Sequence, residues 1–179
     1  MRLAPLVDAL AEATIGETFN FYRDGPGAAR RRRRLRAYLE AREHAGLVLV
    51  GEAAGYRGAR VSGIPFTSER QVSGGDPCES TATIVRAVLG ELGIEEETLL
   101  WNVVPTHPHL PGRPHTNRRP TRAEIAASAP YLAAVAGSRR VVAVGRIAAT
   151  VLAAPSVRHP SHGGASDFRE GLRKVIGRR

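Results

Sequence analysis

Short apolar runs recur along the chain, and longer segments with a helical spacing of apolar residues lie between them. Three of these runs, at residues 47–50, 99–104 and 141–144, have the length of strands and contain no charged side chain. Unbroken runs of this kind are typical of strands that are covered on both faces. They predict a central sheet buried between two layers of helices.

Helical patterns precede, separate and follow the three runs. The stretch Thr121-Arg-Ala-Glu124 is a capping box, which marks the start of a helix. Because strands alternate with helices, we predict an α/β fold. Its form is a three-layer α/β/α sandwich with a short, mostly parallel central sheet, and residues 1–179 make a single domain. The predicted helices cover residues 3–13, 28–45, 79–92, 125–135, 147–152 and 166–176.

The composition narrows the class of protein. With 179 residues, 42% of them apolar, the chain can form a globular core of its own. Its apolar runs fall far short of the roughly 20 residues of a membrane span. Asp8 and Glu12 interrupt the N-terminal segment, where a signal peptide would be apolar. The single cysteine, Cys78, excludes an internal disulfide and an all-cysteine metal site, so we expect a cytoplasmic protein.

The charge favours a polyanionic partner. The chain has 26 lysine and arginine residues against 17 aspartate and glutamate residues, a net charge of +9. Basic side chains displace counterions from phosphate, which favours nucleic acid. A genomic bias toward arginine is the alternative, since arginine far outnumbers lysine, but it does not explain the excess over acidic residues. We interpret the arginine run at residues 30–34 as a solvated helix face rather than a DNA contact.

Ligand sites in parallel sheets lie beyond the carboxyl ends of the strands. After the first run comes GEAAGYRGARVSGIPF, in which glycines allow backbone to approach a ligand and Glu52 places a carboxylate at the strand end. An ion pair with an arginine is the alternative for Glu52, and a place in the core is the alternative for Phe66.

The second strand end carries a polar side chain and three histidines. Asn102 lies between two apolar residues, and a buried amide that faces a pocket offers a donor and an acceptor side by side. Local backbone bonding is the alternative. His107, His109 and His115 raise the possibility of zinc, but the stretch that holds them contains four prolines and matches no ligand spacing that we can defend. We expect no metal site.

The third place is the turn VRHPSHGG, ahead of the last helix. Pro160 stiffens the backbone after His159, and Ser161 is a candidate phosphate contact or helix cap. A purely structural histidine is the alternative.

The ordered motifs GEAAG…GIPF, WNVVPT…NRRPT and HPS resemble the uracil-DNA glycosylase superfamily over residues 47–168, and most closely the branch with a GEAPG first motif. The resemblance implies a cofactor-free, monomeric and monofunctional DNA glycosylase associated with the nucleoid. It would hydrolyse the N-glycosidic bond of uracil, or of a related deaminated base, and leave an abasic site for base excision repair. The base would leave the DNA stack and enter a pocket.

The resemblance also implies a role for each motif residue. Phe66 matches the aromatic ring on which the base stacks. Asn102 matches the amide that reads the base edge, and His159 matches the donor to uracil O2, where negative charge develops. Glu52 matches an acid that positions or activates water, or stabilises the sugar cation.

Two sets of binding positions follow from the same resemblance. Residues expected to contact the base are Gly51, Ala53, Gly55, Phe66, Asn102 and His159. Residues expected to contact DNA are Ser161, His162, Gly163, Arg118 and Arg119.

The chain departs from the family at several motif positions. Ala53 stands where the best-known members have an aspartate, and Gly55 stands where they have a tyrosine that blocks the thymine methyl group. Tyr56 is a possible substitute for that tyrosine. Cys78 alone cannot build the four-cysteine cluster of the GEAPG branch, and His162 stands near the place of the apolar wedge.

Two other functions therefore stay open. Ala53 and the high charge are compatible with a non-catalytic relative that binds damaged DNA. The three histidines of the second loop are compatible, less well, with a metal-dependent hydrolase.

Overall fold

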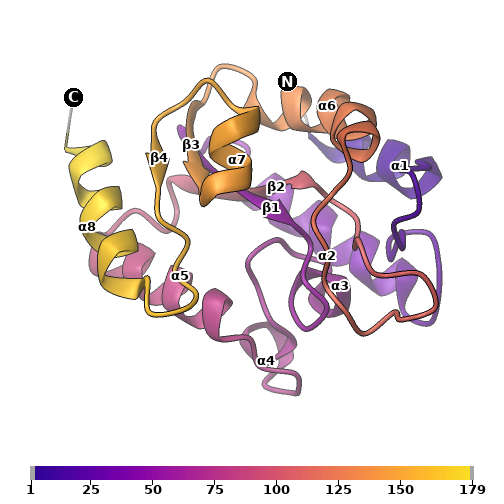
Figure 1. Cartoon of the computed structure of the whole chain (residues 1–179). Coiled ribbons are helices and arrows are strands. Elements are labelled where there is room, and N and C mark those ends of the chain that lie inside the picture. Colours follow the sequence, from indigo (N-terminus) through magenta and orange to yellow (C-terminus); the bar gives the residue numbers. More distant parts are fainter. Residues whose placement is uncertain (1–2, 178–179) are drawn as a thin grey trace.

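The computed structural model describes residues 3–177 and contains a four-stranded, fully parallel sheet in the order β2-β1-β3-β4 (Figure 1). The three apolar runs form the first three strands, as predicted. The fourth strand has only two residues, and no apolar run marks it in the sequence. The strands are β1 Leu47–Ala53, β2 Thr98–Val104, β3 Arg140–Val144 and β4 Ser156–Val157.

All six predicted helices are present, and the capping box of Thr121 and Glu124 starts α6 as predicted. The second helix ends four residues earlier than predicted, because residues 42–44 form a turn. The structure adds α3 and α4, which are too short to show a helical period. The helices are α1 Ala4–Glu12, α2 Ala28–Ala41, α3 Ala59–Ser62, α4 Glu69–Ser73, α5 Ser80–Glu91, α6 Arg122–Ala136, α7 Arg146–Val151 and α8 Ala165–Ile176.

The side chains of β1 point alternately into two separate apolar clusters. Leu47 and Leu49 pack with residues of α5 and α8 on one face of the sheet. Val48 and Val50 pack with residues of α1, α2, α6 and α7 on the other. The helices thus lie on both sides of the sheet (Figure 1), which confirms the three-layer α/β/α sandwich.

The first strand continues beyond its apolar run and reaches Ala53, so Gly51 and Glu52 belong to the strand rather than to a turn. Gly51 pairs in register with Asn102 on β2. Two motif positions from distant parts of the chain are therefore neighbours at the same edge of the sheet.

The arginine run of α2 is partly structural, which corrects the interpretation of a solvated helix face. Arg31 is 7% exposed, and its guanidinium donates to the carbonyl oxygens of Phe21, Asp24 and Pro26. Arg34 donates to both carboxylate oxygens of Glu69. These two side chains fasten α2 to the loops beside it.

Residues 3–177 include no helix with the length and apolar character needed to cross a lipid bilayer.

Candidate active site

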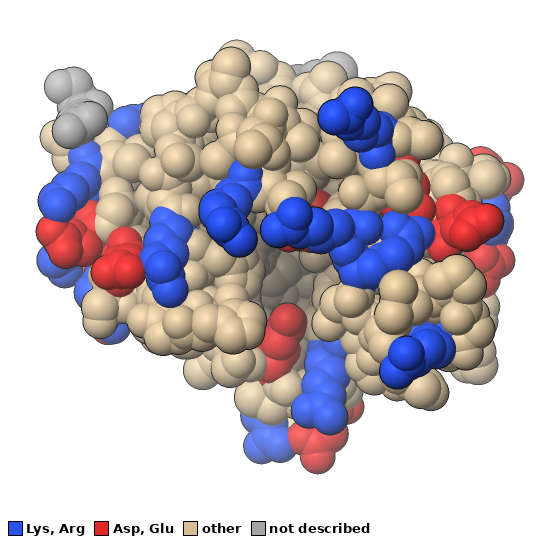
Figure 2. Space-filling view, viewed as in Figure 1, with Lys and Arg blue, Asp and Glu red and all other residues tan. Residues whose placement is uncertain are grey.

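The loops after all four strands surround one cavity of about 900 Å³ at the carboxyl edge of the sheet. Figure 2 shows the hollow near the centre of the molecule, with basic side chains along its upper rim. Ten of the residues predicted for the site line it, whereas Gly51 and Gly163 do not. The ten are Glu52, Ala53, Gly55, Phe66, Asn102, Arg118, Arg119, His159, Ser161 and His162.

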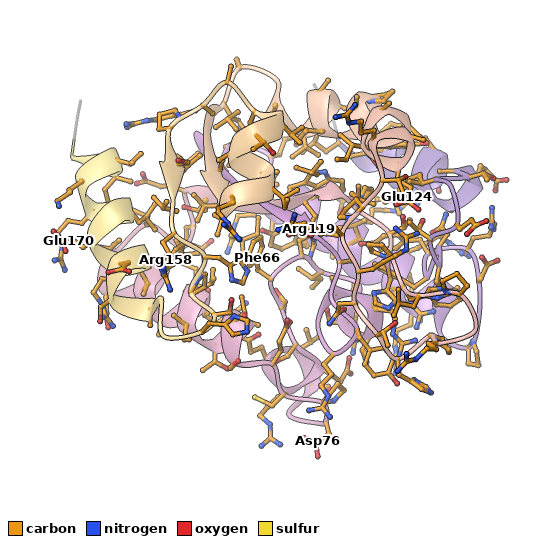
Figure 3. All side chains as sticks on the ribbon, viewed as in Figure 1. Phe66, Asp76, Arg119, Glu124, Arg158 and Glu170 are labelled. Atoms are coloured by element: carbon orange, nitrogen blue, oxygen red, sulfur yellow. The ribbon has the colours of Figure 1, made fainter. Side chains whose placement is uncertain are left out.

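Gly51 lies directly behind the aromatic ring of Phe66. A Cβ atom at Gly51 would be 2.4 Å from Phe66 Cζ and 3.0 Å from Asn102 Oδ1, so only glycine lets the ring lie against the strand. Phe66 itself has φ of 51°, a conformation that bulky residues rarely adopt. The half-buried ring thereby lines the cavity and also packs against the apolar cluster beside it (Figure 3).

The loop that carries Phe66 is held from the N-terminal part of the chain. The Tyr22 hydroxyl donates to Gly63 O at 3.0 Å, and Arg34 Nη1 donates to Ser62 O at 3.3 Å. A Cβ atom at Gly63 would be 2.8 Å from the Cα of Arg31, so α2 packs directly on this turn. The position of the aromatic ring thus depends on α2 and on the turn before it, both of which lie outside the motif region.

Asn102 is 4% exposed, as the sequence predicted for a buried amide, and lines the cavity from the middle of β2. Within the described residues its carboxamide makes no hydrogen bond, so the alternative of local backbone bonding is not what the structure has. A buried amide normally needs partners. Its oxygen and nitrogen are therefore available to a ligand in the cavity.

The hydrogen bonds around His159 define which ring nitrogen carries the proton. The backbone N–H of Ser161 donates to His159 Nδ1 at 3.2 Å, and the Ser161 hydroxyl lies 2.8 Å from the same atom. Nδ1 is therefore the acceptor, and the proton of the neutral ring is on Nε2. Burial, and to a smaller extent His162, lower the pKa of His159, which favours this neutral form. The ring can present an N–H donor to the cavity.

The turn around His159 is compact. A Cβ atom at Gly145, which follows β3 with φ of 85°, would lie 3.2 Å from the Cβ of His159. The Ser161 hydroxyl, which was predicted to contact phosphate, also lies 3.0 Å from His162 Nδ1. It therefore bonds to the imidazole rings of both His159 and His162.

Glu52 is half-buried at the end of β1 and has no ion-pair partner within the described residues. Burial raises the pKa of its carboxyl above the usual range, and the positive charge of Arg119 opposes that rise. A carboxylate in this setting can accept a proton from water near neutral pH.

Two arginines predicted to contact DNA differ in their surroundings. Arg118 donates to both carboxylate oxygens of Glu124, at 2.8 and 2.6 Å, so its guanidinium is held inside the protein. Arg119 is exposed at the cavity, and in the view of Figure 3 it lies on the other side of Phe66 from Arg158.

Four of the cavity-lining residues that the sequence interpretation did not assign to the site bear on its chemistry. Gly145 and Arg146 come directly after the third apolar run, so the strand-end rule could have named them. Arg158 precedes the histidine of the HPS turn, and Glu79 is the first residue of the helix predicted over residues 79–92. The four are Glu79, Gly145, Arg146 and Arg158.

The three histidines of the second loop have partners within the protein. Nδ1 of His107 bonds with Ala54 O at 2.9 Å, and Nδ1 of His109 bonds with Leu110 O at 2.9 Å. His115 bonds to the hydroxyl of Tyr56, and Tyr56 is not among the residues that line the cavity. No group of three or more histidine, cysteine, aspartate or glutamate side chains in residues 3–177 is arranged to hold a metal ion.

The family model of the uracil DNA glycosylase superfamily matches residues 39–175. The chain therefore belongs to this superfamily of DNA glycosylases, in agreement with the motifs. A crystal structure of wild-type SMUG2 from Pedobacter heparinus has a similar fold, with a TM-score of 0.75 and 10% sequence identity. The match covers 99% of this chain and 97% of the other. No curated protein sequence matches the chain significantly.

Proposed function

We propose that the protein is a monofunctional DNA glycosylase that hydrolyses the N-glycosidic bond of uracil, or of a related deaminated base, in DNA. The observation that carries the proposal is that Phe66, Asn102 and His159, from three separate loops or strands, line one cavity. An aromatic face, a free carboxamide and an N–H donor are the groups needed to hold a pyrimidine that has left the DNA stack.

Base recognition rests on the carboxamide of Asn102. Its oxygen accepts from uracil N3–H while its nitrogen donates to uracil O4. Cytosine presents a donor where uracil has O4 and an acceptor at N3, so a carboxamide fixed for uracil leaves buried polar groups unpaired against cytosine. Such mismatches in a buried site give large discrimination.

Bond breaking is assisted by His159. The C1′–N1 bond breaks and both of its electrons leave with the uracil, which becomes an anion with charge on O2. The Nε2–H of a neutral His159 donates to this oxygen and stabilises the charge as it develops. The bonds from Ser161 to Nδ1 hold the ring in the tautomer that this step requires.

Water completes the reaction, and Glu52 is the residue of this chain that can activate it. The water oxygen forms the new bond to C1′, and its proton passes to the Glu52 carboxylate. The product is an abasic site, a substrate for base excision repair. Because Ala53 has no acidic side chain, no second carboxylate is supplied by the neighbouring motif position.

A uracil-containing oligonucleotide tests this function. The wild-type protein is expected to release uracil and to leave alkali-labile abasic sites. Asn102→Ala and His159→Ala are each expected to lower the single-turnover rate about 100-fold, since each removes a donor or acceptor from the transition state. His44→Ala, at an exposed histidine outside the cavity, is the matched control and should retain the wild-type rate.

The proposal is wrong if wild-type protein releases none of uracil, hypoxanthine and xanthine from single- or double-stranded DNA. Tight binding of such DNA without release of the base would instead favour the non-catalytic relative, to which Ala53 points.

A further inference from the structure

Glu79 is an acidic residue in the cavity that none of the family motifs contains. It stands directly before α5, and its carboxyl lies against the loop that follows β1. A Cβ atom at Gly55 would be 3.2 Å from Glu79 Oε1, and one at Gly58 would be 2.0 Å from Glu79 Oε2. The space that side chains at these two glycines would occupy is thus filled by Glu79.

The carboxyl of Glu79 has no partner that would explain its position structurally. Within the described residues it makes no hydrogen bond and no ion pair, whereas the buried Glu69 and Glu124 are each paired with an arginine. Burial raises the pKa of the Glu79 carboxyl. Placing an unpaired carboxyl in a cavity costs free energy, so a role toward the ligand is the better explanation.

The order of the strands places Glu79 relative to a bound pyrimidine. His159 follows β4, at one end of the sheet, and faces O2 in the proposed reaction. Gly55 is on the other side, because the preceding residue Ala54 donates its N–H to Val104 O of β2. C2 and C5 are opposite corners of the pyrimidine ring. A base with O2 at His159 therefore directs C5 toward Gly55 and Glu79.

We propose that Glu79 is the specificity-determining residue that rejects a methyl group at C5, and so separates uracil from thymine. This inference rests on the proposed function of the same cavity. The backbone of Gly55 and Gly58 lies behind the carboxyl, so the carboxyl cannot retreat from a methyl group. The C5–H of uracil is smaller and can approach a carboxyl oxygen as a weak donor. Glu79 thereby blocks the methyl group in place of a bulky side chain at position 55, where this chain has glycine.

Binding of the free bases tests the proposal without requiring turnover. Dissociation constants for uracil and thymine are measured by titration with wild-type protein, Glu79→Ala, Glu79→Gln and Glu97→Ala. Wild-type protein should bind thymine at least about 10-fold more weakly than uracil, the scale of discrimination that one methyl group provides. Glu79→Ala should narrow the ratio to within about 2-fold, while Glu79→Gln, of equal size, should keep it. Glu97→Ala removes an exposed glutamate outside the cavity and should behave as wild type.

Excision of uracil and thymine opposite guanine, with the same proteins, gives the second measurement. The ratio of kcat/KM for the two bases should fall at least about 10-fold in Glu79→Ala. A wild-type ratio retained in Glu79→Ala, or no preference for uracil in the wild-type protein in either assay, overturns the proposal. If wild-type protein releases no uracil, the proposed function fails, yet the binding ratios still decide the role of Glu79. If thermal melting shows that Glu79→Ala is unfolded, Glu79→Asp replaces it in both assays. Its side chain is one methylene shorter, so it should also narrow the ratio of uracil to thymine.

Discussion

At the scale of single residues, the site depends on side chains whose protonation is set by their surroundings. Burial shifts the pKa values of Glu52 and His159 in opposite directions, because burial disfavours the charged form of each. The carboxyl takes up a proton more readily than usual, and the imidazole holds one less readily. The lowered pKa favours the neutral His159 that the proposed reaction uses, and the raised pKa makes the Glu52 carboxylate a stronger base toward water.

The pH dependence of excision follows from Glu52. In the proposed reaction its carboxylate accepts a proton from water, so the rate should rise with pH as the carboxyl ionises. Because burial raises the pKa of Glu52, this increase in rate should occur at higher pH than it would with an exposed glutamate. Single-turnover rates measured between about pH 4 and 8 check this. Glu52→Gln should remove the acidic limb and lower the rate at neutral pH, and an unchanged limb in that variant would show that another group titrates.

At the scale of secondary-structure elements, one glutamate at the start of α6, Glu124, makes three structural contacts. Glu124 accepts from the backbone N–H of Thr121, accepts from both terminal nitrogens of Arg118, and lies against Gly16. It is 1% exposed. The capping box was readable in the sequence, but its arginine partner and its contact with the N-terminal loop were not.

Replacement of Glu124 should lower stability in a pH-dependent way. The hydrogen bond from Arg118 holds the pKa of Glu124 below its usual range. The ionised carboxylate therefore stabilises the fold above its unfolded pKa of about 4.3, and this contribution is lost as the pH falls through the lower folded pKa. Glu124→Gln should cost about 3 kcal/mol at neutral pH, since it leaves Arg118 with no charged partner.

Urea unfolding at neutral pH and at successively lower pH measures this effect. The difference between wild type and Glu124→Gln should shrink toward low pH. Glu170→Gln is the control, because its pair with Lys174 is largely exposed and should matter little. A constant difference at every pH would contradict the assignment to the ionised carboxylate.

Sequence patterns predicted the elements whose signal is local. The apolar runs predicted three strands, and helical spacing predicted the six longer helices. The sequence patterns missed the two-residue strand β4 and the short helices α3 and α4, because each is too short for a periodic pattern to repeat. Motif order led to Phe66, Asn102 and His159, which do line one cavity. Glu79 escaped because its position depends on Gly55 and Gly58, which are distant in the chain, and because it belongs to no motif.

At the scale of the whole molecule, the basic side chains behind the net charge of +9 include a group at the cavity. Basic side chains gather along the upper rim of the cavity in Figure 2. Arg119, Arg146 and Arg158 line the cavity and are exposed, so they can reach phosphates of a strand that crosses it. Arg158 also pairs with the exposed Asp167 at 3.3 Å. Arg31, Arg34 and Arg118 are instead engaged within the fold.

The salt dependence of DNA binding tests whether the arginines of the cavity rim contact the DNA backbone. The logarithm of the association constant should fall linearly with the logarithm of salt concentration. Replacing Arg119, Arg146 or Arg158 with glutamine should reduce the slope by about 0.9 for each phosphate that the variant no longer neutralises. Arg33→Gln, at an exposed position of α2 outside the cavity, should leave the slope unchanged. Equal slopes for all four variants, measured by fluorescence anisotropy, would show that the cavity rim does not hold the DNA backbone.

The hydrogen bonds from Tyr22 and Arg34 to the turn before Phe66 bear on how proteins of this superfamily can be recombined. The matched family region begins at residue 39, after both of these side chains. A hybrid that grafted residues 39–175 onto a foreign N-terminal segment would keep every motif and lose the supports beneath the aromatic ring. We therefore expect that the motif-bearing stretch cannot be transferred alone. The geometry of the cavity depends both on this stretch and on the segment that precedes it.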